Sequence, residues 1–263
     1  MRIFWSVFGI VAQMMFAATV VMLFVFLWGI DISLIQPKRS ESVTHWLPWD
    51  LLLLLQFAVG HSILLHPRTK KRLSKRIPGA MYGVFFCAVT CLSLWATMLF
   101  WKSSTFHVWN ARGTMEKIIH AMLIVSWIAL FYSISLTGFG YQTGWTTWWA
   151  WFRNRKIAPR EFVSSGAYRF FRHPIYLSFM GLIWFNPQMS VDRFVLTTVW
   201  TTYIFIGSEF KDRRLEFYLG DFYRHYRSKV PAYPWNNLPL IAFRSIQRFS
   251  LYLRTPFQSR GTF

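Results

Sequence analysis

The sequence predicts an all-α integral membrane protein. We expect about four full transmembrane helices, a C-terminal re-entrant helical hairpin that makes a fifth membrane segment, and a cytoplasmic helical tail. Hydrophobic residues make up 54% of the 263 residues and aromatic residues 20%, a composition typical of proteins that live in a bilayer. Residues 3–30 carry no charge, and this run is longer than the apolar core of a signal peptide, which has about 7 to 15 residues.

Four windows that are free or nearly free of charge predict the full spans. At 1.5 Å per residue, each is long enough to cover roughly 30 Å of hydrocarbon as a helix. Because no repeat or low-complexity linker separates them, residues 1–263 are interpreted as a single membrane domain. The windows are residues 4–30, 46–65, 79–101 and 118–141.

The fifth apolar region, residues 174–207, is interrupted by Asn186-Pro187 and by Asp192-Arg193. The two remaining pieces would each reach only about 20 Å as helices, which favours a hairpin that enters and leaves on the same side. One long tilted helix is the alternative. Pro187 argues against it, because proline disrupts a helix interior. Residues 208–235 then follow the hairpin as a polar segment.

The cations predict the orientation. Loops 66–78 and 142–173 contain six Lys or Arg each, whereas loops 31–45 and 102–116 contain two each. The positive-inside rule therefore places the N-terminus, the two basic loops and the tail in the cytoplasm, as in a protein of a bacterial inner membrane. Only the hairpin keeps the ten Lys or Arg after Gly207 on that side.

The formal net charge of +19 does not indicate a nucleic-acid partner. The cations lie in loops beside apolar spans, where membrane orientation and anionic lipids account for them. Residues 240–253 place apolar side chains on one face and Arg244 and Arg248 on another, the pattern of an interfacial amphipathic helix. Cys87 and Cys91 are interpreted as packing residues, and no spacing typical of a metal site is found.

Two polar blocks predict a small-molecule site on the cytoplasmic side. In the first, Pro174 suits the first position of a helix, so Arg172 and His173 lie beside unpaired backbone donors that favour an anionic group. The surrounding aromatic side chains offer faces for a purine or a cation. An aromatic belt with a snorkelling arginine is the alternative.

The second block begins where the hairpin emerges. Glu209, Asp212 and Glu216 recur at helical spacing, and Tyr223 and Tyr226 follow on one face. These residues suit a zwitterionic ligand whose ammonium or sulfonium meets the acids while its carboxylate meets the arginine of the first block. A solvated face, on which neighbouring cations pair with the acids, is the alternative.

Together the blocks resemble the C-terminal signature of the isoprenylcysteine carboxyl methyltransferase superfamily, integral membrane enzymes that bind S-adenosylmethionine in this region. Residues 50–62 and 185–190 are also similar to segments of the bacterial methanethiol S-methyltransferases. The Arg-His-Pro-x-Tyr core has a related pattern in sterol C14-reductases. The matching residues are Gly166-x-Tyr168-x3-Arg172-His173-Pro174-x-Tyr176 and Leu215-x4-Gly220-x2-Tyr223-x2-Tyr226-x3-Val230-Pro231.

The resemblance implies transfer of the methyl group of S-adenosylmethionine to a small thiol, such as methanethiol, which would become dimethyl sulfide. Two alternatives are methylation of a lipidic or prenylated thiol or carboxylate, and a non-enzymatic relative of the nitrite and nitric-oxide reductase accessory proteins. In one departure, Lys211 and Asp212 stand where the family has a Glu-Glu pair. The implied cofactor-binding residues are Gly166, Tyr168, Arg172, His173, Pro174, Tyr176, Glu209, Asp212, Tyr223 and Tyr226.

His61 is the candidate general base. The reactive form of a thiol is the thiolate, so the reaction needs a group that removes or recruits the thiol proton. His61 lies inside the second predicted span, where an ionisable side chain is a functional hypothesis by default. A polar contact between helices is the alternative role. Asp50, which shares its helix face, is interpreted as structural or interfacial.

Overall fold

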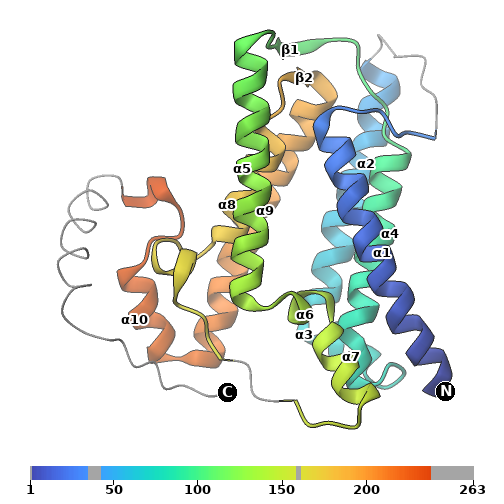
Figure 1. Cartoon of the computed structure of the whole chain (residues 1–263), viewed down its shortest axis with the longest axis vertical. Helices are drawn as coiled ribbons and strands as arrows, with labels where there is room; N and C mark the ends of the chain where they lie inside the picture. Colours follow the sequence, from blue (N-terminus) through green and yellow to red (C-terminus); the bar gives the residue numbers. More distant parts are fainter. Residues whose placement is uncertain (1, 35–42, 158–160, 238–263) are drawn as a thin grey trace.

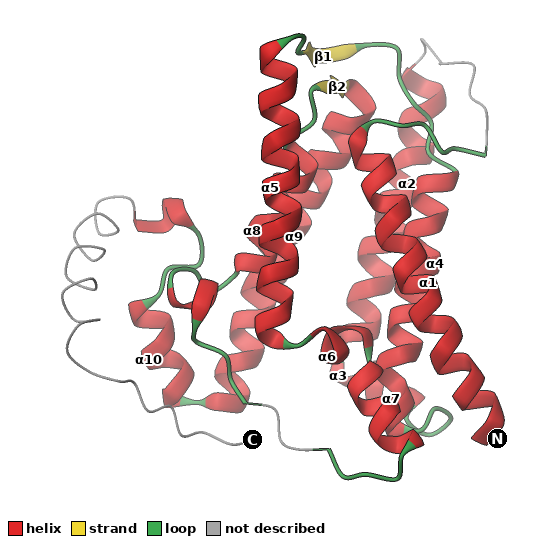
Figure 2. Cartoon of the chain, viewed as in Figure 1, coloured by secondary structure: helices red, strands yellow, loops and turns green. Residues whose placement is uncertain are grey.

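Long helices arranged side by side dominate the structure, a computed structural model that describes residues 2–34, 43–157 and 161–237 (Figures 1 and 2). Four helices are long and apolar enough to cross a membrane. The mostly helical architecture and the four predicted spans are thus confirmed. The four are α1 (Arg2–Trp28), α2 (Val43–Leu65), the continuous segment Gly79–Leu99 formed by the short 3-10 helix η1 (Gly79–Met81) and α4 (Tyr82–Leu99), and α5 (Thr114–Thr137).

Helix α4 holds α1 on one side and α2 on the other. Trp95 of α4 donates its indole N–H to Thr19 Oγ1 of α1 at 2.7 Å. On the α2 side, Gln56 Nε2 donates to the carbonyl of Ser93 at 2.9 Å, and Ser93 Oγ donates to Gln56 Oε1 at 2.7 Å. Polar side chains in apolar helices find partners on neighbouring helices because an unpaired polar group in hydrocarbon is costly.

A helical hairpin completes the bundle beside α5. It consists of α8 (Pro174–Trp184) and α9 (Val191–Leu219), which are joined by a turn that contains strand β2 (Gln188–Ser190). Helix α9 has 29 residues and continues past Gly207, the residue at which the sequence analysis ended the apolar hairpin region. No proline or helix-ending glycine motif interrupts it there, and it ends at Gly220, whose φ is 55°.

The turn of the hairpin is fixed to the connection between α4 and α5. Strand β2 pairs antiparallel with β1 (His107–Asn110) of that connection. Fully buried Asp192 accepts hydrogen bonds from Trp101 Nε1 at 2.8 Å and from the backbone N–H of Ser104 at 2.9 Å. Asp50 holds the same connection by accepting from the N–H of Lys102 at 3.1 Å. Asp50 therefore makes the structural contact that was expected of it.

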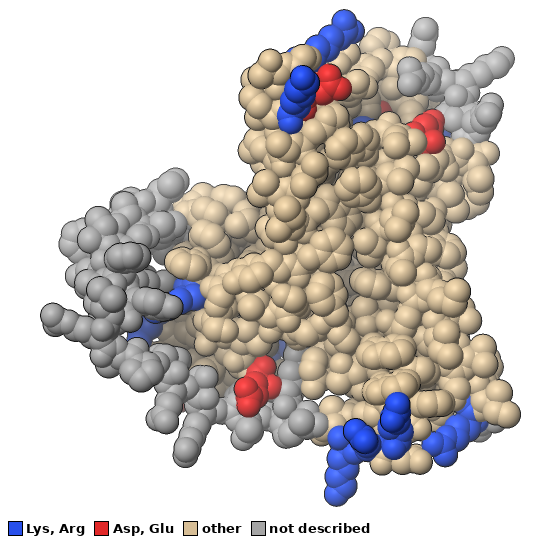
Figure 3. All heavy atoms as spheres, in the orientation of Figure 1, with Lys and Arg blue, Asp and Glu red and all other residues tan. Residues whose placement is uncertain are grey.

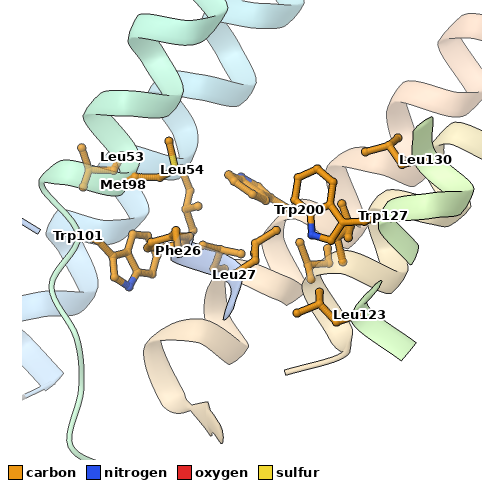
Figure 4. Close-up of a cluster of buried hydrophobic side chains, with 13 residues drawn as sticks. Phe26, Leu27, Leu53, Leu54, Met98, Trp101, Leu123, Trp127, Leu130 and Trp200 are labelled. Carbon is orange, nitrogen blue, oxygen red and sulfur yellow. The ribbon is translucent and has the colours of Figure 1, made fainter. Parts of the chain in front are cut away.

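One hydrophobic core joins the two groups of helices (Figure 4). It takes side chains from α1, α2 and α4 on one side and from α5, α8 and α9 on the other. Burying a large apolar side chain contributes about 1.5 to 3 kcal/mol to stability, relative to leaving it exposed to water. Buried members include Phe26, Leu54, Met98, Trp101, Leu123, Trp127, Leu182 and Trp200.

Short helices lie at the end of the bundle where α1 begins (Figure 1). In α7, the indole N–H of Trp148 donates to the carbonyl of Trp5 at 2.9 Å. Gly9 makes room for this ring, because a Cβ there would lie 2.0 Å from Trp148 Nε1. The remaining elements are α3 (Pro67–Leu73), α6 (Phe139–Thr143), α7 (Trp145–Phe152), η2 (Gly166–Arg169), α10 (Asp221–Lys229) and η3 (Pro234–Asn237). The amphipathic helix expected at 240–253 lies outside the described residues.

Candidate functional site

Asp212 lies at the centre of a buried polar cluster. Its carboxylate oxygen Oδ1 is 3.0 Å from His173 Nε2 and accepts a hydrogen bond from the hydroxyl of Tyr223. The other oxygen, Oδ2, is 3.2 Å from Arg172 Nε and 3.0 Å from Arg172 Nη2. Arg172, His173, Asp212 and Tyr223 are called the Asp212 cluster below. It joins the two polar blocks of the sequence.

Local chain geometry brings the cluster together. Pro174 begins α8, where its missing N–H leaves no intrahelical hydrogen bond unmade, and this places His173 at the start of the hairpin. Gly220 adopts a φ of 55°, a conformation that a residue without Cβ reaches without strain. The chain turns there between α9 and α10, and Tyr223 thereby returns to the side of Asp212.

Arg172 makes contacts with three parts of the chain. Besides contacting Asp212, its Nη1 donates to the carbonyl of Val230 at 2.6 Å and to that of Arg227 at 3.1 Å. Its backbone N–H donates to the carbonyl of Pro231 at 2.9 Å. The guanidinium thus connects the start of α8 to α9 and to the Val-Pro part of the signature. Its expected contact with a ligand carboxylate remains a prediction.

The charges of the cluster are set by burial and hydrogen bonding. Burial alone would raise the pKa of Asp212, but the hydrogen bond from His173, that from Tyr223 and the charge of Arg172 bring it down to about 2. Burial lowers the pKa of His173 despite the nearby carboxylate, and the positive charges of Lys211 and Arg172 act in the same direction. Burial also raises the pKa of Tyr223. Asp212 is therefore ionised and His173 neutral near pH 7.

In neutral His173, one ring nitrogen is a hydrogen-bond acceptor that no donor reaches. If Nε2–H donates to Asp212, then Nδ1 is an acceptor. Both ring nitrogens are buried, and neither makes a well-aligned hydrogen bond to the residues that the structure describes. Nε2 nevertheless lies 3.0 Å from Asp212 Oδ1, which leaves Nδ1 as the nitrogen without a partner. Since buried polar atoms are nearly always paired, this acceptor suits an N–H or O–H group of a ligand.

Aromatic rings surround the imidazole. The ring of His173 stacks on Tyr176 with centroids 5.4 Å apart, and Tyr233 lies on another side at 5.7 Å. Lys211 Nζ lies 5.1 Å from the centroid of the Tyr176 ring. The hydroxyl of Tyr226 donates to the carbonyl of Tyr168. The structure thus brings the predicted tyrosines of both blocks close to the Asp212 cluster.

Three other predicted residues lie apart from Asp212. A Cβ on Gly166 would lie 2.7 Å from Leu136 Cδ1, so this glycine allows η2 to approach α5. Glu209 is 3.0 Å from Arg213 and 3.4 Å from Arg227, and Glu216 is 3.1 Å from Arg227. Glu209 thus forms with Arg213 the local ion pair that the solvated-face alternative describes, whereas Glu216 pairs with Arg227 of the next helix.

His61 belongs to a different part of the molecule. Its Nδ1 is 3.4 Å from Thr90 Oγ1 of α4, and its ring centroid is 6.4 Å from that of Tyr203 in α9. Ser62 Oγ is 3.1 Å from the hydroxyl of the same tyrosine. Tyr203 precedes Asp212 on α9 by about 14 Å of helix rise. His61 of α2 and the Asp212 cluster therefore both lie beside α9, at different heights along it, and do not touch each other.

Sequence reasoning did not single out Tyr203 and Tyr233. Tyr203 lies in an apolar arm whose residues show no motif, and only the fold reveals its contact with α2. Tyr233 follows the Val-Pro pair of the signature by two residues, a proximity that could have drawn attention to it.

Comparisons with known proteins agree with this picture. No protein-family model and no solved structure matches the chain. It is 25% identical to the methanethiol S-methyltransferase of Crocosphaera subtropica over 232 residues, which cover 88% of this chain and 91% of that protein. It is 26% identical to the methanethiol S-methyltransferase of Mycobacterium tuberculosis over 192 residues, 71% of this chain and 77% of that one.

A protein with a different name is also similar. Nurim of Rattus norvegicus is 28% identical over 177 residues, 63% of this chain and 66% of that protein. The matches to methanethiol S-methyltransferases extend further along the chain than this one. The resemblance carried by the Arg-His-Pro signature is therefore confirmed, and this chain is similar over most of its length to the methanethiol S-methyltransferases.

Proposed function

We propose that this protein is an integral membrane methyltransferase that transfers the methyl group of S-adenosylmethionine to methanethiol. The observation that carries the proposal is the Asp212 cluster, because three residues of the signature, Arg172, His173 and Tyr223, meet Asp212 there in a chain similar to proteins named for this reaction. The thiolate sulfur attacks the methyl carbon and a new S–C bond forms. The sulfonium C–S bond breaks, its electron pair stays on the departing thioether sulfur, and the products are dimethyl sulfide and S-adenosylhomocysteine.

The residues around His173 fit the methyl donor. The buried acceptor His173 Nδ1 suits an N–H group of the ligand. The faces of Tyr176 and Tyr233 suit an adenine ring or a sulfonium. Arg172, which the sequence analysis expected to meet the carboxylate of the ligand, lies in the same cluster. S-adenosylmethionine would supply the reactive methyl group, and these side chains would bind and orient it.

His61 is proposed as the base that receives the thiol proton. A free thiol is mostly protonated near neutral pH, so a base beside the acceptor raises the fraction of thiolate. Holding the sulfur and the methyl carbon in line, away from water, would supply much of the remaining acceleration.

We also propose the membrane arrangement expected from the sequence, with the hairpin entering and leaving on the cytoplasmic side of an inner membrane. The turn of the hairpin lies beside the connection between α4 and α5, and the apolar part of α9 from Val191 to Gly207 reaches about 25 Å. In Figure 3, the charges near the N-terminus are Lys and Arg, whereas the opposite end of the bundle shows Lys and Arg together with Asp and Glu, and the visible middle between the two ends is largely uncharged. This distribution supports a cytoplasmic position for the end that contains the N-terminus.

Membranes that contain the protein, incubated with methyl-labelled S-adenosylmethionine and methanethiol, test the function. Labelled dimethyl sulfide should accumulate in the headspace, and membranes that contain Asp212→Asn should form much less. Label in the lipid fraction instead would indicate a lipidic acceptor. Binding of S-adenosylmethionine without any labelled product from a series of thiols would refute the proposal and favour a non-enzymatic role.

A further inference from the structure

An open groove of about 320 Å³ lies between α2 and α4. Both helices are long and apolar enough to cross a membrane, so a molecule dissolved in the bilayer can approach the space between them. No lining side chain is acidic, lysine or arginine, and this excludes a counter-charge for an ionic ligand. The lining residues are Gln56, Phe57, Gly60, His61, Leu64, Val89, Thr90, Leu92, Ser93 and Ala96.

Most polar groups of the groove are already paired. The amide of Gln56 exchanges hydrogen bonds with Ser93 at 2.9 and 2.7 Å and contacts Thr97 Oγ1 at 3.2 Å. Thr90 Oγ1 donates its single proton to the carbonyl of Phe86 at 2.8 Å. The groove thus offers an apolar space in which few polar groups seek a new partner.

This pairing determines the state of His61. Because the Thr90 proton goes to the carbonyl of Phe86, Thr90 Oγ1 can only accept from His61, which places the imidazole proton on Nδ1 at 3.4 Å. Nε2 is then the nitrogen with a free lone pair. A neutral imidazole with an unprotonated Nε2 is the form that accepts a proton from a bound acid.

We propose that this groove is the acceptor site, where a small, neutral, apolar thiol enters from the bilayer and its S–H meets His61 Nε2. The inference rests on the proposed function. The S–H bond breaks, the proton passes to Nε2, and the electron pair left on sulfur attacks the methyl carbon. A lipid acyl chain would also fit the apolar walls but makes no use of a histidine. The contacts of His61 and Ser62 with Tyr203 connect the groove to α9, which carries Asp212.

Filling the groove tests the assignment. A Cβ at Gly60 meets no atom within 4 Å, so Gly60→Leu adds a side chain to the open space without an initial clash. We expect the KM for methanethiol to rise about tenfold or more, because the new side chain competes with the thiol, while the Kd for S-adenosylmethionine stays unchanged. Gly207→Leu on α9 is the matched control, since its Cβ also meets nothing within 4 Å.

Enlarging the groove gives a second, independent measurement. Leu92→Ala should raise the ratio of kcat/KM for propanethiol to that for methanethiol about tenfold, in line with what hydrophobic pockets discriminate per methylene. His61→Gln should make the rate follow the thiolate concentration, so that it rises with pH up to the pKa of the thiol. This change of pH profile would not result from a merely structural role.

The outcomes separate this inference from the proposed function. If wild-type membranes methylate no thiol, both fail. If they do methylate methanethiol, but Gly60→Leu and Leu92→Ala leave the KM and the thiol preference unchanged, the function stands and the groove is not the acceptor site. Displacement of a photoreactive acyl-chain probe by Gly60→Leu, without an effect on KM, would assign the groove to lipid.

Discussion

His173 Nε2 lies 3.0 Å from Asp212 Oδ1, and only 1% of the histidine side chain and 2% of the aspartate side chain are exposed. Burying a carboxylate is expensive unless hydrogen bonds and an opposite charge compensate for lost water. Here a neutral imidazole, a phenol and the guanidinium of Arg172 supply them. The ionised carboxylate thus holds together three segments that are distant in sequence.

Asp212→Asn should weaken binding of S-adenosylmethionine by about ten- to a hundred-fold, as expected for loss of a charged hydrogen-bonding group. Glu216→Gln is the matched control, because Glu216 pairs with Arg224 and Arg227 on a more exposed face. Calorimetry on detergent-purified protein gives both affinities. Equal losses in the two variants would show that Asp212 has no special role in binding.

Arg172→Lys should lower the thermal stability of the protein as well as its affinity for S-adenosylmethionine. Lysine keeps the charge but cannot reach Asp212 and the carbonyls of Arg227 and Val230 together. Breaking a buried ion pair costs about 3 to 5 kcal/mol. Arg213→Lys is the control, because its exposed pair with Glu209 is worth less than about 1 kcal/mol. Unchanged melting of the Arg172 variant would contradict the role described for this guanidinium.

Stability should fall as the pH drops from 7.5 to 5.5. His173 has a lowered pKa in the folded protein, so below the ordinary value of 6.5 the unfolded chain binds more protons. The stabilisation is complete above 6.5 and is lost as pH falls toward the folded pKa. His173→Gln should flatten this part of the melting profile, because the variant lacks the imidazole that titrates there. Asp212 contributes to the pH dependence of stability only in strong acid, because its pKa falls from the ordinary 3.8 to about 2 in the folded protein.

Lys211→Glu should leave the affinity for S-adenosylmethionine unchanged or improve it, because it introduces the acid that the sequence resemblance implies at this position. Removing the positive charge should also raise the pKa of His173, which Lys211 now helps to lower. Lys211→Met separates the loss of the cation from the gain of an acid. Loss of activity toward every thiol with intact cofactor binding would instead make Lys211 an acceptor-recognition residue.

Reporters fused after residue 235 and within residues 68–76 should give the same, cytoplasmic signal. This follows if the chain between Pro174 and Gly207 turns beside the connection between α4 and α5 and returns to the side from which it entered. A fusion in the connection between α4 and α5 should give the opposite signal. Opposite signals from the first two fusions would mean that α9 carries the C-terminal segment across the membrane.

The sequence predicted the four long helices because each is a charge-free run of sufficient length, a signal that needs no tertiary information. It also predicted the turn of the chain near Pro187, because proline disrupts a helix. The pairing of β1 with β2 escaped prediction, since strands of four and three residues are too short to show alternation. The short helices around Trp148 escaped it too, because their basic surroundings resembled an ordinary loop.

At the candidate site, the signature identified Arg172, His173 and Tyr223, and helical spacing drew attention to Glu209, Asp212 and Glu216. Neither pattern could say which of these acids is buried. Asp212 and Glu216 lie one turn apart on the same helix, and only the fold places one under His173 and the other beside Arg227. Likewise, the groove beside His61 depends on how α2 meets α4, which no pattern along a single helix encodes.

Helix α9 runs without a break from the β1–β2 pair at one end of the bundle to Asp212 near the other. A helix of this length behaves as a stiff rod on the scale of side-chain motions, so a tilt at one end must displace the other. A fluorescent probe near Gln188 would then detect cofactor binding at a distance of about 30 Å. Occupancy of the Asp212 cluster would thus become measurable at the opposite end of the bundle.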